Sequence, residues 1–268
     1  MTNLIFIDMD GTLISFEEGG QYIPPSALKA IEEARKKGNL VYICTGRSLA
    51  EIQTVDVGKV DGFIGGAGAF VIHQGAYIYK SSFQKSEILE LMDFCDRNAV
   101  VYYLESDLGL YYVPAFPERM KGVVDIFEDE GYKSILKPIQ EADFSSVNKV
   151  CFYTGEKEVF EMFRKNYQDR FNITDVSFGD YDIIMGEVSQ KGITKAYAMQ
   201  QLLDYLALDE VKTYAIGDSL NDREILEASD VAIVMGNARE NVKALADFVT
   251  ESVMDDGIAV ALKHFDLV

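Results

Sequence analysis

Two aspartates, Asp8 and Asp10, follow the apolar run of residues 4–7 near the start of the chain. Side chains two positions apart in an extended strand point to the same side, so both carboxylates face one small volume. Two anions this close are tolerated when a cation lies between them or when one acid keeps its proton. Both conditions suit phosphoryl transfer, in which one carboxylate attacks phosphorus and the other donates a proton to the leaving oxygen. An acidic turn is the alternative, because Asp10 and Gly11 form a common turn pair.

A second polar segment, Thr45 and Gly46, comes directly after the apolar run 40–44. A threonine hydroxyl together with exposed backbone amides at a helix start can cradle a phosphate group. Capping of a helix by Thr45 or Ser48 explains the same residues equally well. The segment therefore indicates a phosphate site only if other polar groups reach the same edge of a sheet.

A third polar segment consists of Lys191 and Gly192, just before a predicted helix. A single lysine in such a place is usually a solvated charge. It also offers the local positive charge that an acidic protein needs in order to hold a phosphate group. Lys191 is therefore a candidate phosphate ligand.

The fourth segment begins with Asp218, which follows the predicted strand 211–215. Magnesium prefers oxygen ligands and uses few protein carboxylates, so Asp218 can share a metal ion with the first acid pair. Asn221 and Asp222 are expected to orient that ligand or a metal-bound water. A helix N-cap with an acidic first turn is the competing explanation. Together, the four segments indicate a phosphate and metal site much more strongly than any one of them alone.

The apolar runs predict the sheet that brings these segments together. The runs 4–7, 40–44 and 62–66 are typical of strands covered on both faces, and a helix between the first two makes a right-handed parallel crossover. Residues 69–79 predict a hairpin, and alternating helix and strand patterns return after residue 190. Ligands gather at the carboxyl ends of parallel strands, so we expect the four polar segments at one edge of the sheet.

The middle of the chain has a different pattern, with local hairpins and aromatic strands that indicate a separate α+β unit. The predicted fold class is therefore α/β, with a doubly wound, Rossmann-like parallel sheet as core and an inserted α+β domain. The core is expected at 1–82 and 189–268, and the inserted domain at 83–188. Within the insert, the predicted helices are 86–98, 118–131 and 157–167, and the predicted strands are 100–106, 109–114, 148–155 and a hairpin at 175–188.

Composition restricts the classes of partner. The chain has 268 residues and a formal net charge of -19, so its average surface repels nucleic-acid phosphates and anionic lipid. Its three cysteines are far apart, which favours reduced thiols over a disulfide framework. We find neither a signal-peptide pattern nor a long apolar run, and we expect a cytoplasmic protein. The composition does not indicate the oligomeric state.

The order of the four segments resembles a known family. DMDGT at 8–12, TGR at 45–47, KG at 191–192 and GDSLND at 217–222 are similar to the four motifs of the haloacid dehalogenase (HAD) superfamily. Within it, the chain resembles the Cof-type phosphatases with a large inserted (type IIB) cap. The resemblance covers nearly the whole chain, including NA at 237–238 and DDG further on. It implies a HAD-like catalytic core and a cap that selects the substrate.

The resemblance also implies roles for the site residues. Asp8 would be the nucleophile that forms an aspartyl-phosphate, and Asp10 the general acid and later the general base. The Mg²⁺ cofactor would be held by the Asp8 carboxylate, the Asp10 backbone carbonyl and Asp218, with Asp222 in support. The transferring phosphoryl oxygens would be held by Thr45, the amide of Gly46 and Lys191, with Asn221 nearby.

Two residues stand outside these roles. Ala67 follows the third predicted strand, where the resembling enzymes commonly carry an asparagine, so any contribution of that asparagine is absent here or comes from elsewhere. Arg47, the last residue of TGR, is interpreted first as a structural or rim residue.

The sequence therefore predicts a magnesium-dependent phosphatase that hydrolyses a small phosphorylated metabolite, with a sugar phosphate favoured. A phosphomutase using the same aspartyl-phosphate is one alternative, and a non-enzymatic phosphoacceptor or sensor domain is another. The inserted cap argues against the sensor, because a receiver needs no enclosure. Dehalogenation is disfavoured, since that reaction needs neither Asp10 nor a metal.

Overall fold

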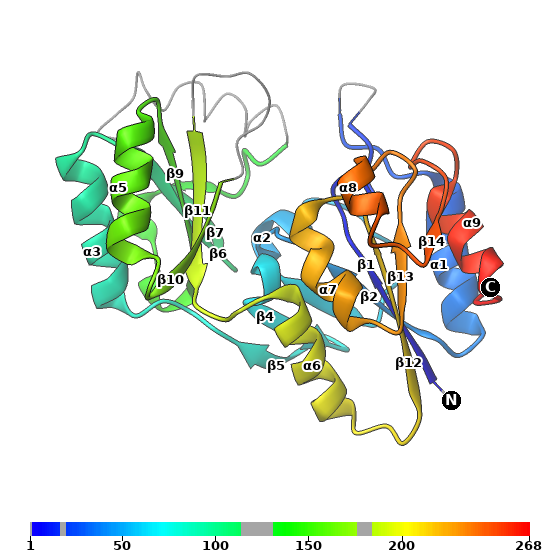
Figure 1. The fold of residues 1–268 in the computed structure, drawn as a ribbon. Coiled ribbons are helices and arrows are strands. Elements are labelled where there is room, and N and C mark those ends of the chain that lie inside the picture. The colour runs from blue at the N-terminus through cyan, green and yellow to red at the C-terminus, as the bar shows by residue number, and fades with distance from the viewer. Residues whose placement is uncertain (1, 17–19, 114–130, 176–183) are drawn as a thin grey trace. The chain divides into compact units, whose positions relative to one another are not determined.

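The computed structural model describes all residues except 1, 17–19, 114–130 and 176–183, and shows a chain divided into two compact units (Figure 1). The chain leaves the first unit twice, once for a short segment and once for a long one. The first unit contains Met1–Arg47, Asp56–Lys80 and Thr194–Val268, and the second contains Ser48–Val55 and Ser81–Ile193.

The first unit is built on an eight-stranded sheet with the order β14-β13-β12-β1-β2-β3-β4-β5. The strands from β14 to β3 pair in parallel, whereas β4 and β5 extend the sheet as an antiparallel hairpin. The predicted parallel core and the hairpin are thus confirmed. The strands are β1 (Thr2–Ile7), β2 (Leu40–Cys44), β3 (Gly62–Gly65), β4 (Phe70–His73), β5 (Ala76–Lys80), β12 (Val211–Gly217), β13 (Val231–Val234) and β14 (Phe248–Val249).

Helices cover both faces of this sheet. In Figure 1, α1 and α9 lie to one side of the strands and α6 and α7 to the other. The buried faces of α6 and α7 pack on Leu4, Phe6, Tyr42 and other apolar side chains of the central strands. Residues 238–246 have the pattern of a helix, of which only α8 is helical, and the sequence pattern does not predict α9. The helices are α1 (Pro25–Lys36), α6 (Lys195–Leu206), α7 (Arg223–Ala228), α8 (Glu240–Lys243) and α9 (Gly257–His264), with 3₁₀ turns η1 (Gly66–Gly68) and η4 (Leu220–Asp222).

Local sequence explains the bounds of α1. Pro25 suits the first helical position because its fixed φ matches the helix and its missing N–H is not needed there. The helix stops before Gly38, whose φ of +96° is costly for other residues. Between them, Ala27, Ile31 and Ala34 form part of the buried face, as their helical spacing predicts.

The second unit contains a six-stranded sheet with the order β10-β11-β9-β6-β7-β8, antiparallel except between β7 and β8. Two helices pack on one of its faces over an aromatic core that includes Phe94, Phe152 and Phe163. The strands are β6 (Val101–Ser106), β7 (Gly109–Tyr112), β8 (Leu136–Pro138), β9 (Val147–Thr154), β10 (Phe171–Asp175) and β11 (Ile184–Gln190); the helices are α2 (Leu49–Ile52), α3 (Lys85–Arg97) and α5 (Lys157–Tyr167), with 3₁₀ turns η2 (Ile139–Glu141) and η3 (Phe144–Ser146).

This second unit agrees with the predicted α+β pattern at most points. The predicted closing hairpin corresponds to the antiparallel pair β10 and β11, although β10 begins at Phe171, four residues earlier than expected. The turn of that hairpin and the predicted helix 118–131 lie outside the described residues, apart from the last residue of the helix.

The cysteines are all buried and free, as expected for reduced thiols. Cys44 lies in the first unit, and Cys95 and Cys151 lie in the second. Among the described residues, none of the helices has both the length and the apolar character that crossing a membrane requires.

Candidate active site

Charged side chains from β1, from the turn after β12 and from α6 meet in the first unit. Asp8 follows β1, and its backbone N–H donates to the Ile216 carbonyl oxygen at 3.0 Å. Lys195, the first residue of α6, donates from Nζ to Oδ1 of Asp8 and to Oδ1 of Asp222, both at 2.6 Å. The exposed fractions of Asp8, Lys195 and Asp222 are only 5%, 2% and 1%. Removing one partner from such a buried group leaves an uncompensated charge, so the three side chains depend on one another.

Burial and like charges dominate the electrostatics of this group. Burial raises the pKa of Asp8 and the Asp222 carboxylate raises it further, while the Lys195 ammonium opposes both. Burial alone would lower the pKa of Lys195, but Asp222 and Asp8 outweigh it, so the pKa lies well above its ordinary value. Burial, with help from Asp222, raises the pKa of Asp218 to about 6. Three acids facing one ammonium favour the binding of a further cation.

Asp218 joins the group from the end of β12. The Thr12 hydroxyl donates to Asp218 Oδ1 at 3.1 Å. Gly11 approaches the same carboxylate so closely that a Cβ atom on it would lie 2.4 Å from Asp218 Oδ2. The φ of Gly11 is +79°, which also favours glycine. The Asp10–Gly11 pair is therefore more than an acidic turn, because the glycine allows Asp218 to approach β1.

The donor set fits a magnesium ion. Carboxylate oxygens of Asp8, Asp218 and Asp222 lie within 4.8 Å of one another, and oxygen ligands are those that hard divalent cations prefer. Asp222 is already engaged at both oxygens, since Oδ1 accepts from Lys195 and Oδ2 accepts from the backbone N–H groups of Asp218 and Ser219 at 3.1 and 3.2 Å. The arrangement thus suits a metal bound through Asp8 and Asp218, with Asp222 orienting its neighbours.

Asp10 is held by Arg47, which the sequence analysis left as a structural or rim residue. Arg47 Nε lies 3.1 and 3.0 Å from the two Asp10 carboxylate oxygens, and Nη2 donates to Oδ1 at 2.5 Å. Its Nη1 donates to Gln21 Oε1 at 3.0 Å. The arginine is 6% exposed, whereas the Asp10 side chain is 44% exposed. Such a planar pair fixes the direction of the carboxylate. In the sequence, the signal for a role of Arg47 was its position in TGR, two residues after the candidate phosphate ligand Thr45.

Three of the predicted phosphate ligands, Thr45, Gly46 and Asn221, follow the strands on either side of β1. Thr45 follows β2 directly and is fully buried, and its hydroxyl oxygen accepts the backbone N–H of Arg47 at 3.2 Å, with Gly46 between them. Asn221 lies in η4 and is exposed, with Oδ1 accepting the Ser219 hydroxyl at 2.7 Å. Their phosphate contacts stay predictions.

Lys191 does not join the group, and its expected place is wrong. It is exposed, belongs to the second unit, and donates from Nζ to the Gln168 carbonyl oxygen at 2.7 Å. The reason is a misplaced helix start: β11 continues to Gln190, a turn follows, and α6 begins only at Lys195 after its N-cap Thr194. The lysine at the acid group is therefore the one at the true helix start.

A signal for Lys195 was present in the sequence. It shares the buried face of α6 with Ala198, Met199 and Leu202, at the spacing of one helix stripe. A lysine within an apolar stripe requires a buried partner. Gly68 helps to place it, because a Cβ on Gly68 would lie 2.2 Å from the Thr194 carbonyl oxygen.

Ala67 precedes that glycine and takes a left-handed conformation, with φ 55° and ψ 33°. Asparagine tolerates this region better than alanine does, which is a backbone reason for the asparagine of the resembling enzymes. The backbone N–H of Ala67 donates to the Thr45 carbonyl oxygen at 3.0 Å. Ala67 thus contacts the loop after β2 through its main chain.

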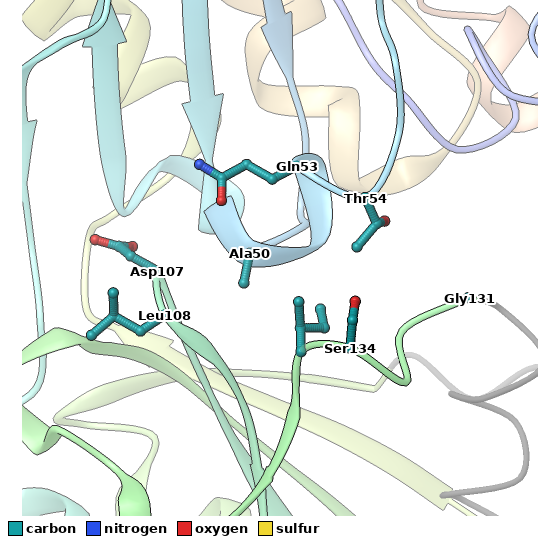
Figure 2. A pocket seen from close by; sticks show the side chains of 8 residues that line it. Ala50, Gln53, Thr54, Asp107, Leu108, Gly131 and Ser134 are labelled. Carbon is teal, nitrogen blue, oxygen red and sulfur yellow. The ribbon is translucent and has the colours of Figure 1, made fainter.

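A cavity of about 370 Å³ in the second unit is a poor candidate for the phosphate site (Figure 2). Side chains of α2 and of the β6–β7 turn face it. The lining residues include neither lysine nor arginine, so the cavity offers no positive charge to an anion. They are Ala50, Gln53, Thr54, Asp107, Leu108, Gly131, Ser134 and Ile135.

Comparison with known proteins agrees with this geometry. Residues 5–262 match the sequence model of the haloacid dehalogenase-like hydrolases. The chain belongs to this family. The match confirms the resemblance to this superfamily.

Phosphatase YwpJ of Bacillus subtilis (strain 168) is 27% identical to this HAD hydrolase over 288 residues, covering 97% of this chain and 99% of YwpJ. The 5-amino-6-(5-phospho-D-ribitylamino)uracil phosphatase YcsE of the same organism is 29% identical over 273 residues, covering 98% and 96%. The solved structure of the HAD subclass IIB sugar phosphatase BT4131 has a TM-score of 0.77 and 28% identity, covering 100% of both chains.

Proposed function

We propose that this HAD hydrolase is a magnesium-dependent phosphatase that works through an aspartyl-phosphate. The observation that carries the proposal is the buried Lys195, which contacts Asp8 and Asp222 close to Asp218. A carboxylate beside a fixed cation and an oxygen-rich metal site has what a phosphoryl acceptor needs. The family match supports hydrolysis, and the names of the relatives support phosphate esters as substrates.

In the first step, a carboxylate oxygen of Asp8 attacks phosphorus, and the bond from phosphorus to the alcohol oxygen breaks as protonated Asp10 donates its proton to that oxygen. In the second step, Asp10 takes a proton from water while the water oxygen attacks phosphorus. The bond to Asp8 then breaks, which releases inorganic phosphate and restores the free carboxylate. The Lys195 ammonium offsets the negative charge of Asp8 and of the phosphoryl oxygens.

Magnesium would be held by Asp8, Asp218 and the Asp10 backbone carbonyl, and when bound it supplies further neutralisation of the phosphoryl charge. Thr45 and the amide of Gly46 are the further phosphate ligands that we propose, with Asn221 near them. Lys195 takes the role that the sequence analysis gave to Lys191.

The pairing of Asp10 with Arg47 adds a conformational step. Arg47 contacts both carboxylate oxygens of Asp10, and an oxygen that carries a proton for the leaving group cannot also accept from the guanidinium, so at least one of these contacts must be given up when Asp10 acts as the acid. We infer that the Asp10 side chain turns between Arg47 and the substrate during the cycle. Its partial exposure leaves room for that rotation.

For the substrate, we propose a small phosphorylated metabolite with a hydroxyl-rich alcohol part. YcsE is named for a ribityl phosphate and BT4131 is described as a sugar phosphatase. We further propose that the inserted unit, predicted at 83–188, acts as the cap that selects this alcohol part. The acidic chain makes nucleic acid a poor substrate because the overall charge repels a polyphosphate backbone.

The test is release of inorganic phosphate from a panel of sugar, polyol and nucleoside monophosphates, with magnesium and with a chelator. Asp8→Asn is expected to abolish release, because an amide cannot form the acyl phosphate. Asp209→Asn, which changes an exposed aspartate of the first unit, is the matched control and should keep the wild-type rate. Steady release by Asp8→Asn at the wild-type rate would refute the nucleophile.

The same panel separates the alternatives. A phosphomutase would convert one phosphate ester to its isomer without releasing phosphate in proportion. A phosphoacceptor domain would become labelled on Asp8 by a small phosphodonor but would turn over none of the esters.

A further inference from the structure

The loop after β13 carries an asparagine that the proposed mechanism does not use. Asn237 donates from Nδ2 to the Gly11 carbonyl oxygen at 2.8 Å, and its Oδ1 accepts the backbone N–H of Val253 at 3.2 Å. The partners fix which end of the amide is which, because a carbonyl needs a donor and an N–H needs an acceptor. One side chain therefore connects the loops that follow β1, β13 and β14.

The strand order places the Asn237–Gly11 hydrogen bond next to Asp218. In the sheet, β12 lies between β13 and β1, so the Asn237–Gly11 hydrogen bond spans the end of β12, where Asp218 stands. Gly11 closely approaches the Asp218 carboxylate, and the adjacent Thr12 donates to it. The main chain between Asp10 and Thr12 is thus fixed by Asn237 through its carbonyl and by Asp218 through the neighbouring hydroxyl.

The loop that holds Asn237 is itself fixed by main-chain hydrogen bonds. The Met235 N–H donates to the Gly217 carbonyl oxygen at 3.0 Å, and the Gly236 N–H donates to the Glu251 carbonyl oxygen at 3.0 Å. A Cβ on Gly236 would lie 2.9 Å from backbone atoms of the loop after β14, which contains Glu251. Asn237 is exposed, so apolar burial does not explain its position. Its side chain therefore reaches from a loop held by main-chain hydrogen bonds to the segment that contains Asp10, the proposed general acid.

We propose that Asn237 is a positioning residue for the active site. Its amide holds the Gly11 carbonyl and, through it, the Asp10–Thr12 main chain, so that Asp10 and Asp218 keep their mutual placement in the reaction. This inference rests on the proposed phosphatase function, because its main readout is the turnover of a phosphate ester.

Two substitutions separate this role from a purely structural one. Asn237→Ala removes both hydrogen bonds, whereas Asn237→Asp keeps an acceptor for the Val253 N–H and places a second acceptor against the Gly11 carbonyl. If Asn237 positions Gly11, both variants lose kcat by about 10–100-fold, the range seen for residues that orient metal ligands, and Asn237→Asp is no better than Asn237→Ala. KM should change little, since substrate contacts are not removed.

If Asn237 acts only by accepting the Val253 N–H, the kcat values of the two variants should differ from each other. Asn237→Asp would then match the wild type and only Asn237→Ala would be impaired, which would overturn the proposal. Wild-type kcat in Asn237→Ala would also overturn it.

A matched control comes from the second unit. Asn98 donates from Nδ2 to the Phe94 carbonyl oxygen at 2.8 Å, at the end of α3. Asn98→Ala removes a similar hydrogen bond and should lower the melting temperature while leaving kcat unchanged. A loss of kcat in both alanine variants, in proportion to their lost thermal stability, would mean that Asn237 acts through stability alone, and the proposal would fail.

A readout without substrate makes the result independent of turnover. Hydrogen exchange of the Gly11 and Thr12 amides, measured on the metal-free protein, should be faster in Asn237→Ala than in the wild type and unchanged in Asn98→Ala. Unchanged exchange in Asn237→Ala would overturn the proposal. Failure of the wild type to release phosphate from any ester would count against the proposed function and leave the exchange result to decide this inference.

Discussion

Each unit of the molecule contains a lysine buried between two carboxylates. In the first unit, Lys195 contacts Asp8 and Asp222. In the second, Lys149 Nζ lies 2.9 Å from Glu105 Oε2 and 3.1 Å from Glu187 Oε1. The two lysines are equally inaccessible, with exposed fractions of 2% and 3%. Burial and ion pairing therefore do not by themselves distinguish the proposed active site from the second lysine group in this protein.

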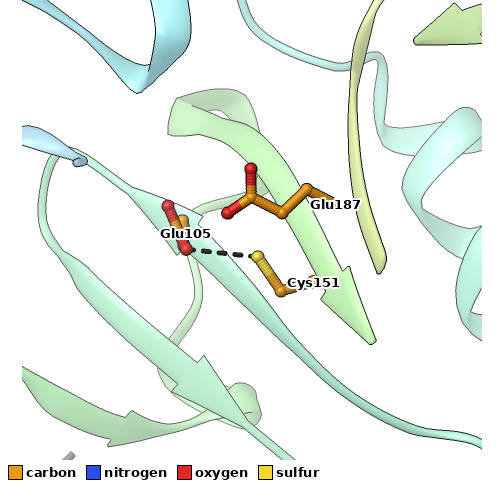
Figure 3. Close-up of side chains that lie close together, drawn as sticks. All are labelled: Glu105, Cys151 and Glu187. Atoms are coloured by element: carbon orange, nitrogen blue, oxygen red, sulfur yellow. Dashed lines mark hydrogen bonds between the residues drawn. The ribbon is translucent and has the colours of Figure 1, made fainter. Parts of the chain in front are cut away.

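The second group, Lys149 with Glu105 and Glu187, lies on one face of the sheet of the second unit. Figure 3 shows Glu105, Cys151 and Glu187 close together, from the neighbouring strands β6, β9 and β11. The strand register pairs Glu105 with Lys149 and Cys151 with Glu187. The Cys151 thiol donates to Glu105 Oε1 at 3.2 Å. Cross-strand neighbours of this kind stabilise one register of the three strands.

The chemistry of the two groups also differs. Burial and the nearby Glu105 raise the pKa of Cys151 well above its ordinary value, so the thiol stays protonated and is a poor metal ligand. The possible metal ligands of the first group are all carboxylate oxygens, from Asp8, Asp218 and Asp222. They lie where the strands β1 and β12 end and loops begin. Ligands reach parallel sheets at such ends, whereas side chains within a strand serve the sheet itself.

The largest expected effect is on catalysis. Lys195→Met removes the cation beside Asp8, the proposed nucleophile, and should lower kcat by about 10²–10³-fold, as for the loss of one preorganised electrostatic group. Lys191→Met changes an exposed lysine four residues earlier and should leave kcat unchanged. Phosphate release at saturating substrate measures both. An equal loss in the two variants would contradict the assignment of Lys195.

The next effect is on stability. Lys149→Met leaves buried carboxylates without their cation and should lower the free energy of unfolding by about 3–5 kcal/mol. Adding Glu105→Leu should restore much of this loss, because apolar side chains often replace a buried ion pair without cost. Urea unfolding of both variants is the measurement. A double variant as unstable as the single one would show that the ion pair is not the cause.

The two units should also respond to pH in different ranges. Burial raises the pKa of Asp218 to about 6, so its protonated form is favoured by folding, and this contribution to stability is lost as the pH rises through about 6. Magnesium binds the ionised carboxylate, so it should raise the melting temperature more at neutral pH than near pH 5. Asp218→Asn should remove this dependence, and an undiminished magnesium response in that variant would exclude Asp218 as a ligand.

In the second unit, burial and then Glu105 raise the pKa of Glu51 to about 8. The stability that comes from its protonated form should therefore be lost as the pH rises through about 8, whether or not magnesium is present. Glu51→Gln should remove this second transition in melting temperature. A transition that moves with magnesium would assign it to the first unit instead.

The smallest expected effect is at Ala67, next to the glycine that packs against the start of α6. Its left-handed backbone is unfavourable for alanine, so Ala67→Asn should stabilise the protein by about 0.5–1 kcal/mol. Ala207, with a φ of 45°, is a matched left-handed alanine at the end of α6, and Ala207→Asn should give a similar gain. Thermal unfolding compares the two. A gain at Ala207 alone would mean that asparagine meets a steric conflict at position 67.

The first group was largely predictable from the sequence, and the second was not. Asp8 and Asp218 come at the ends of segments that the sequence predicts as strands of one parallel sheet, so we expect them to meet at the carboxyl edge of that sheet. Glu105, Lys149 and Glu187 lie on strands far apart in the chain, and their contact depends on strand order and register, which no local pattern shows. The sequence pattern predicts a helix directly after Lys191, whereas the N-cap Thr194 makes α6 begin at Lys195, a difference that hydrophobic periodicity alone does not show.

The positions of the three cysteines have a practical consequence. Burial raises the pKa of Cys44, Cys95 and Cys151, and a protonated, enclosed thiol reacts with an alkylating reagent only after the surrounding structure opens. Cys44 lies in β2 of the first unit, and the other two lie in α3 and β9 of the second. The rate at which each thiol is labelled therefore measures how often its own unit opens. The natural cysteines thus allow the opening of the two units to be measured separately in one protein.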